Sequence, residues 1–155
     1  MEEIIRRSAK LLDLPVEEDA VRGIAKRSRK TPRIANRILK RARDLFEVHK
    51  ETVMDKEVAQ KLFDMLEIDE VGLGNVDLKY LGIIAKKFQN QPVGVETISM
   101  SMSEDRRTIE EFIEPYLLQL GFIKKTPRGR VVTPKGLSHI KVHPLSSDAD
   151  QPQLV

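Results

Sequence analysis

Apolar residues recur at helical spacing through most of the first 66 residues. Four segments place apolar residues three or four positions apart, which is the period of an amphipathic α-helix that packs on one side. They fall near residues 4–12, 20–25, 32–49 and 56–66. The third is the clearest, because one apolar stripe follows it along its length: Ile34, Ala35, Ile38, Leu39, Ala42, Leu45 and Phe46. The pattern predicts a four-helix bundle over residues 1–68, with Asp55 as the N-cap of its fourth helix.

The start of the third helix combines favourable backbone signals with unfavourable charges. Thr31 is a preferred N-cap and Pro32 a preferred first helical residue, so the helix is predicted to begin here. Arg29, Lys30 and Arg33 crowd this end, although the N–H groups of a helix start already carry about half a positive charge. Either these cations belong to a solvated basic face, or an anion such as a phosphate binds there and removes the conflict. The pattern alone leaves both explanations open.

Beyond residue 68 the helical pattern is interrupted. Residues 69–76 combine glycines with acids and are predicted to be a linker. A helix near residues 78–88, a short helix near 95–102 and a longer helix follow. Ser103 is expected to cap the longer helix, Pro115 to bend it and Gly121 to end it. Its core face is expected to comprise Ile109, Phe112, Ile113, Tyr116, Leu117 and Leu120.

Two short strands then flank the turn at residues 126–129. The order of helix, short helix, longer helix and hairpin predicts a winged helix-turn-helix domain over residues 77–143. Residues 144–155 lack a pattern and are expected to be disordered. The predicted fold class is therefore mainly α: a four-helix bundle, followed by a winged helix with a small β-hairpin.

The amino-acid composition argues against several kinds of functional site. The chain of 155 residues is 40% hydrophobic and 33% charged, with a net charge of +3. It has no cysteine, and its three histidines lack ligand spacing, so no metal site is predicted. No apolar run approaches the roughly 20 residues that a membrane helix needs, which favours a cytoplasmic protein. Phosphate-loop and nucleophile motifs are missing too, so this chain is expected to contain no catalytic residues and to be inactive by itself.

Basic residues concentrate where a winged helix meets DNA. In helix-turn-helix proteins the second helix of the pair presents its N-terminal residues to the duplex, here Arg106 and Arg107. The hairpin adds four more cations: Lys124, Lys125, Arg128 and Arg130. Basic hairpins also arise merely from solubility and edge protection. Because both clusters lie where the motif would touch a duplex, contact with DNA phosphates is favoured, and nothing in the pattern indicates base-specific readout.

Two long stretches resemble one known family. TPRIANRILKRARD (residues 31–44) and RTIEEFIEPYLLQLGFIKKTPRGRVVTP (residues 107–134) have the order and separation seen in the RuvB family of bacterial Holliday-junction branch-migration ATPases. The similarity runs from about Ile4 to Pro134 and is to the C-terminal part of those proteins. Members are AAA+ ATPases in which a nucleotide-binding domain precedes a helical lid and a winged helix. The resemblance implies that residues 1–68 are the lid and that a nucleotide-binding domain precedes Met1.

The resemblance also implies residue roles. Arg33 corresponds to the sensor-2 arginine, which reaches from the lid to the phosphates of ATP, held with Mg²⁺ by the preceding domain. The DNA-backbone contacts of the family fall on Arg106, Lys125 and Arg130, with Arg128 close by at the hairpin tip. Lys125 stands where the family often has arginine. Arg107 stands where it often has an acid, so Arg107 would add a phosphate contact.

The implied function is that of an ATP-driven DNA motor in recombination and repair. Such motors form hexameric rings around the duplex arms of a Holliday junction, work with RuvA, and join RuvC when the junction is resolved. Two other interpretations stay open from the sequence. The chain could be the lid and winged helix of a replication-initiator ATPase, or a stand-alone winged-helix DNA-binding regulator.

Overall fold

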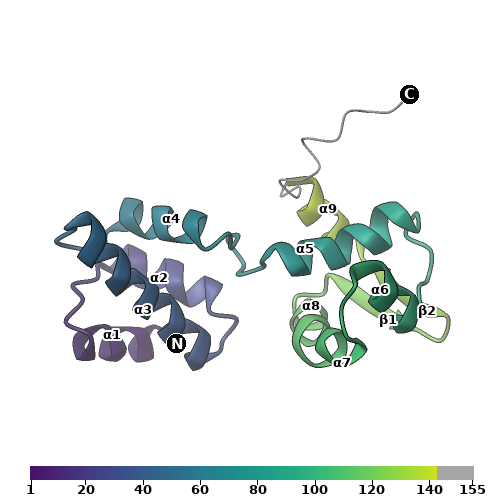
Figure 1. The fold of residues 1–155 in the computed structure, drawn as a ribbon, viewed down its shortest axis with the longest axis horizontal. Helices are drawn as coiled ribbons and strands as arrows, with labels where there is room; N and C mark the ends of the chain where they lie inside the picture. Colours follow the sequence, from purple (N-terminus) through teal and green to yellow (C-terminus); the bar gives the residue numbers. More distant parts are fainter. Residues whose placement is uncertain (143–155) are drawn as a thin grey trace. The chain divides into compact units, whose positions relative to one another are not determined.

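A computed structural model describes residues 1–142, which form two compact units, Met1–Gly74 and a second that begins at Asn75 (Figure 1). The predicted fold class is confirmed, since the described residues are mainly helical and contain one small antiparallel hairpin. The predicted disordered tail, residues 144–155, lies outside the described residues.

The first unit is the predicted four-helix bundle. Its helices are α1 (Glu2–Leu11), α2 (Glu18–Arg27), α3 (Pro32–His49) and α4 (Lys56–Met65). The longest of them, α3, packs against the other three, as Figure 1 shows. The core is built from the predicted apolar stripes, with Met54 added from the loop before α4; its members with no exposed surface are Ile5, Ala20, Ile24, Ala35, Leu39, Ala42 and Met54. Burying each large aliphatic side chain stabilises the bundle by roughly 1.5–3 kcal/mol.

Backbone hydrogen bonds join the loop before α2 to the loop before α4. The Glu17 N–H donates to the Met54 carbonyl at 2.9 Å, and the Met54 N–H donates to the Pro15 carbonyl at 2.8 Å. Next to this pair, the Asp55 carboxylate accepts a hydrogen bond from the Val58 N–H at 2.9 Å, which confirms the predicted cap of α4. The starts of α2 and α4 are therefore held side by side.

Residues 69–73, predicted as part of a linker, fold onto the end of α2. The Asp69 carboxylate accepts from two backbone N–H groups, including that of Leu73 at 2.9 Å. Gly72 has a φ of +85°, and a Cβ there would lie 2.5 Å from the Arg27 carbonyl oxygen. The Arg29 Nε donates to the Gly72 carbonyl at 3.0 Å. The glycines and acids of this predicted linker thus build a tight turn, in which the Asp69 side chain accepts backbone hydrogen bonds and Gly72 adopts positive φ.

The second unit has the predicted order of a winged helix. It contains α5 (Asn75–Gly82), which continues as a π-helical turn (Ile83–Lys87), and then α6 (Val95–Met102). A long helix follows without a break: α7 (Arg106–Thr108), a π-helical turn (Ile109–Ile113) and α8 (Glu114–Gln119). The hairpin strands are β1 (Ile123–Thr126) and β2 (Gly129–Val132), and α9 (Pro134–Val142) ends the described chain.

Two details of the predicted long helix are wrong. Ser103 ends α6 with a left-handed φ of 54°, whereas a helix N-cap needs extended backbone. Asp105 is the N-cap instead, and its carboxylate accepts from the Arg107 N–H at 3.0 Å. Phe112 is 62% exposed and does not join the core. The wider π-helical turn before Pro115, a residue that cannot donate a backbone hydrogen bond, keeps Ile109 and Ile113 inside and rotates Phe112 outward.

The helix α9 was not predicted, although its start repeats a signal seen earlier in the chain. Thr133 and Pro134 form the same Thr-Pro pair as Thr31 and Pro32. The Gly136 N–H donates to the Thr133 hydroxyl at 3.2 Å, which is the hydrogen bond of a helix N-cap. Because α9 has only nine residues, it is too short to show a clear helical repeat of apolar positions.

Candidate nucleotide and nucleic-acid sites

The turn that presents Arg33 is set by backbone geometry. Arg29 and Lys30 both adopt left-handed backbone, with φ of 53° and 55°, and the Thr31 N–H donates to the Ser28 carbonyl at 2.9 Å. Thr31 is the N-cap residue, as predicted, but its hydroxyl donates to the Arg29 carbonyl at 3.1 Å. The Thr31 side chain therefore does not cap α3. Pro32 has no N–H, and the Ile34 and Ala35 N–H groups both donate to the Thr31 carbonyl at 3.1 Å, so in this first turn the Arg33 N–H is left for another acceptor.

Arg33 itself is exposed in the first turn of α3. Within residues 1–142, no group forms a hydrogen bond or ion pair with its side chain. Arg33 lines a shallow pocket along the outer face of α3 together with Asn36, Arg37 and Lys40. The Oδ1 atom of Asn36 is buried and accepts no hydrogen bond from the described residues. Three cations beside an uncapped helix start make this surface able to receive a polyanion.

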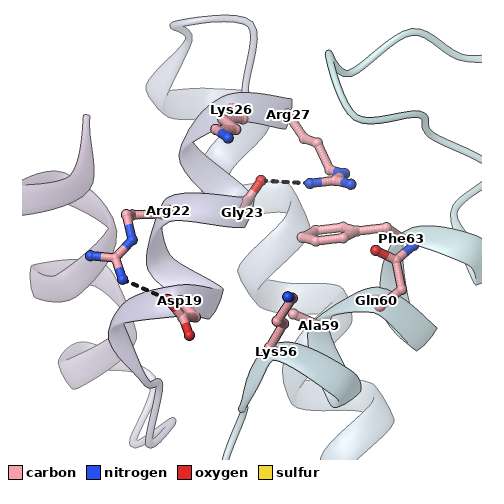
Figure 2. Close-up of a pocket in the computed structure, with 9 residues that line it drawn as sticks. All are labelled: Asp19, Arg22, Gly23, Lys26, Arg27, Lys56, Ala59, Gln60 and Phe63. Atoms are coloured by element: carbon pink, nitrogen blue, oxygen red, sulfur yellow. Dashed lines mark hydrogen bonds and ion pairs between the residues drawn. The ribbon is translucent and has the colours of Figure 1, made fainter.

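A second basic feature of the bundle lies between α2 and α4, and the sequence did not reveal it (Figure 2). The Arg27 guanidinium lies 4.0 Å from the centre of the Phe63 ring, and its NH1 donates to the Gly23 carbonyl at 3.2 Å. Burial lowers the pKa of Arg27 against the pull of nearby acids. Arg27 therefore joins α2 to α4 by stacking on an aromatic ring, a contact that helical periodicity cannot show.

In the winged helix, two predicted DNA contacts are engaged by neighbouring carboxylates. Arg106 NH1 lies 2.6 Å from Glu96, and its Nε lies 3.4 Å from Glu110. Arg107 Nε donates to Glu111 at 3.0 Å. Both arginines are exposed, so water and salt weaken these pairs and the guanidinium groups can exchange to other anions.

Lys125 and Arg130, by contrast, converge on a carboxylate that has no exposed surface, that of Glu114. Arg130 donates to both of its oxygens, from Nε to Oε1 at 2.8 Å and from NH2 to Oε2 at 3.3 Å. Lys125 Nζ lies 3.0 Å from Oε2, and the buried Tyr80 hydroxyl donates to Oε1 at 2.8 Å. A buried charge is stable only when it is paired and hydrogen-bonded in this way.

The protonation states of this Glu114 cluster follow from its contacts. Burial opposes ionisation of Glu114, but hydrogen bonds from Arg130, Tyr80 and Lys125 together hold its pKa below the ordinary value. Burial and the adjacent carboxylate raise the pKa of Tyr80, so its hydroxyl stays protonated and donates. The hydrogen bond to Glu114 raises the pKa of Arg130 despite burial. Glu114 and Arg130 thus form an ion pair at neutral pH.

Arg128 differs from the other predicted DNA contacts. It lies exposed in the hairpin turn, where its backbone N–H donates to the Thr126 hydroxyl at 3.3 Å. Its side chain forms no hydrogen bond or ion pair with any residue in the described part of the chain, and the same holds for exposed Lys124. The structure therefore separates the basic hairpin residues into a paired set and a set open to solvent.

Other kinds of site receive no support from residues 1–142. No group of three or more His, Asp or Glu side chains gathers there as a set of metal ligands. None of the helices in that range is both long and apolar enough to cross a bilayer.

The order of the two domains indicates which class of protein this chain belongs to. A four-helix bundle that carries an arginine at the start of its third helix, followed by a winged helix, is the arrangement expected for the lid and DNA-binding parts of an AAA+ protein. Residues 1–69 match the family model of the RuvB AAA lid domain, and residues 70–141 match that of the RuvB C-terminal winged helix domain. The chain belongs to the RuvB family.

Individual relatives agree with this assignment. The chain is 45% identical over 151 residues to the Holliday junction branch migration complex subunit RuvB of Solibacter usitatus, a match that covers 97% of the chain and 44% of that protein. It is 44% identical over 140 residues to the subunit of the same name from Lacticaseibacillus casei, covering 90% and 41%. The solved Thermotoga maritima RuvB Holliday junction branch migration motor matches with a TM-score of 0.86 and 44% identity, covering 90% of the chain and 47% of that structure. The chain thus spans less than half the length of these relatives.

Proposed function

We propose that this chain supplies the nucleotide-sensing lid and the DNA-contacting winged helix of a RuvB-type branch-migration motor. The observation that carries the proposal is the pair of RuvB domain matches, which follow one another in the RuvB order across residues 1–141. This match favours the motor over a replication initiator or a stand-alone regulator. The proposed partners are duplex arms of a Holliday junction, RuvA, RuvC and further copies of the motor subunit in a hexameric ring.

Arg33 is the proposed link between ATP and the lid. Its side chain has no partner among residues 1–142, and neither has its backbone N–H, so a phosphate can accept from the guanidinium and from this N–H together. A charge-assisted contact to the γ-phosphate is present with ATP and lost with ADP. ATP and ADP then differ in how strongly they favour one lid position over the other. A nucleotide can shift the lid only through such a difference in affinity.

The winged helix is the proposed DNA-contacting part. Arg106 and Arg107 at the start of the long helix, and the hairpin cations, are candidates for phosphate contacts. Since such contacts carry no sequence information, binding is expected to be independent of sequence and to weaken steeply with salt. That behaviour suits a motor that moves along duplexes of any sequence.

The test joins this chain to the nucleotide-binding domain of the Thermotoga maritima relative. We expect the chimaera to hydrolyse ATP, with stimulation by DNA, and to migrate synthetic four-way junctions in the presence of RuvA. The nucleotide-binding domain alone is the control for hydrolysis. A soluble, folded chimaera that binds ATP but shows no stimulation by DNA and no junction movement would refute the motor proposal.

A further inference from the structure

Glu110 joins the long helix of the winged-helix unit to the hairpin through one carboxylate oxygen. Its Oε1 lies 3.4 Å from Nε of Arg106, at the start of the long helix, and 3.5 Å from NH2 of Arg130 on β2. The two guanidinium groups belong to different elements, yet both contact the same oxygen. A single anionic oxygen can therefore bridge the helix start and the hairpin at this point.

The contacts of Glu110 are looser than those of Glu114, the other acid that Arg130 contacts. Glu114 has no exposed surface and accepts from Arg130 Nε at 2.8 Å. The Glu110 side chain is 35% exposed, and its contacts with both arginines are long. Because water and salt screen ion pairs of exposed groups, Glu110 can turn into solvent at little cost. Breaking the contact with Glu114 would instead leave a buried charge unpaired.

Arg130 keeps donors for a second anion while it stays bound to Glu114. Its Nε and NH2 donate to Glu114, and none of residues 1–142 accepts from NH1. A guanidinium has five N–H donors, so a phosphate can accept from NH1 and from the second N–H of NH2. The Arg106 side chain is 53% exposed, and its other acidic partner, Glu96, is 69% exposed. Both arginines can thus exchange an exposed carboxylate for a phosphate.

We infer that Glu110 occupies the position of a DNA phosphate oxygen, and that one backbone phosphate displaces it to bind Arg106 and Arg130 together. Glu110 then competes with the duplex and lowers its affinity, while Glu114 keeps the hairpin arginine in place. The inference rests on the proposed DNA-binding role of the winged helix. It goes further by assigning two arginines of different elements to one phosphate, and an acid to the control of affinity.

The decisive variant for the competition is Glu110→Gln. It keeps the size of the side chain but removes the charge that competes with phosphate, so we expect duplex affinity at low salt to rise about tenfold. Glu104→Gln is the matched control: Glu104 lies just before the long helix, pairs with no cation among residues 1–142, and gives the same change in net charge. If net charge alone mattered, the two variants would bind equally tightly.

Two double-mutant cycles test the shared phosphate. If Arg106 and Arg130 bind one phosphate, Arg106→Gln and Arg130→Lys together should weaken binding by less than the product of their separate effects. Contacts with two different phosphates would give independent effects. In the second cycle, Arg106→Gln should remove at least about half of the gain, on a logarithmic scale, that Glu110→Gln produces, because the bridging site is then lost.

Binding is measured by fluorescence anisotropy of a labelled duplex, with tyrosine fluorescence of the same samples as the check on folding. A Glu110→Gln chain that binds no more tightly than Glu104→Gln overturns the competition. Independent effects in the cycles overturn the shared phosphate. The Arg106 and Glu110 variants change exposed side chains, so they decide the matter even if Arg130→Lys unfolds. Failure of the unaltered chain to bind any duplex at low salt would instead refute the proposed DNA-binding role itself.

Discussion

Val93 and Arg130 exchange two backbone hydrogen bonds, from the Val93 N–H to the Arg130 carbonyl at 3.0 Å and from the Arg130 N–H to the Val93 carbonyl at 2.7 Å. Asn90 extends this pairing with its side chain, which donates to the Val132 carbonyl at 3.0 Å and accepts from the Val132 N–H at 2.9 Å. The loop before α6 thus forms an isolated antiparallel bridge beside β2. Backbone pairing restrains one edge of the hairpin, while Glu114 restrains its inner face.

Gly129 tests the backbone part of this anchor. Its φ is +138°, and a Cβ there would lie 2.5 Å from the Val93 carbonyl carbon. We expect Gly129→Ala to destabilise the winged-helix unit by about 1–3 kcal/mol, because the strained backbone and the clash both oppose the native hairpin. Both tyrosines of the chain lie in this unit and the chain has no tryptophan, so tyrosine fluorescence during urea unfolding reports on this unit alone.

Gly82 provides the control for that substitution. It has helical φ of −64°, and a Cβ there meets nothing within 4 Å. Gly82→Ala is expected to leave stability unchanged or to raise it by up to about 1 kcal/mol, since alanine favours the helix. Equal effects of the two substitutions would show that Gly129 is not required by its backbone conformation.

Arg33→Ala tests the link between nucleotide and lid. In the chimaera with a nucleotide-binding domain, we expect ATP hydrolysis at least about tenfold slower, or hydrolysis that no longer drives junction migration, because the γ-phosphate loses a charge-assisted contact. Arg7→Ala is the matched control, since Arg7 is an exposed arginine of α1 that does not line the pocket beside Arg33. Unaltered hydrolysis and migration in the Arg33 variant would contradict the sensing role.

The Glu114 cluster predicts a pH dependence of stability. Its hydrogen bonds hold the pKa of Glu114 below the ordinary value of about 4.3, so the stabilisation is complete above that pH. It is lost as the pH falls through the lowered pKa, because the folded unit must then bind a proton at a buried carboxylate. We expect the tyrosine-monitored free energy of unfolding to fall below about pH 4.5 in the original chain. The loss should be smaller in Glu114→Gln. In Glu111→Gln, which alters an exposed carboxylate, it should equal that of the original chain. An equal loss of unfolding free energy at acid pH in all three chains would argue against the cluster.

Leu39 tests the core of the lid. It has no exposed surface in the middle of α3, so Leu39→Ala should cost about 2–5 kcal/mol through lost burial and the cavity left behind. Leu11, 79% exposed at the end of α1, is the control, and Leu11→Ala should change stability by less than about 0.5 kcal/mol. Hydrogen exchange of the α3 amides measures both effects within the first unit. Comparable losses would mean that α3 is not the centre of the bundle.

Local signals explain which parts of the fold could be predicted. The bounds of α3 follow from Pro32 and from an apolar stripe that is contained within one segment. The cap at Asp55 is likewise local, because its carboxylate accepts from the N–H of a residue only three positions later. Ser103 was misassigned because two capping residues, Ser103 and Asp105, lie two positions apart, and only the backbone conformation shows which one precedes the helix. Sequence signals were therefore sufficient where the deciding contact is short in sequence.

The same distinction between local and distant contacts separates the candidate site residues that could be predicted from those that could not. Arg33 could be selected from the sequence because its conflict with the start of its own helix is local. Glu114 could not, because its partners Tyr80 and Arg130 lie 34 and 16 residues away. Nor could the stacking of Arg27 on Phe63, since it joins two helices.

By itself, the sequence determined the helical segments before the hairpin, the basic character of the hairpin and the family resemblance, because each depends on neighbouring residues or on a short repeat of apolar positions. Only the tertiary structure decided which cations are paired with a buried acid. Burial brings a carboxylate from one helix against cations of a hairpin, and a charge removed from water must be paired. Arg130 and Lys125 supply that pairing, whereas Arg128 and Lys124 do not. Residues of the same type, a few positions apart, thus have different contacts because they face different surroundings.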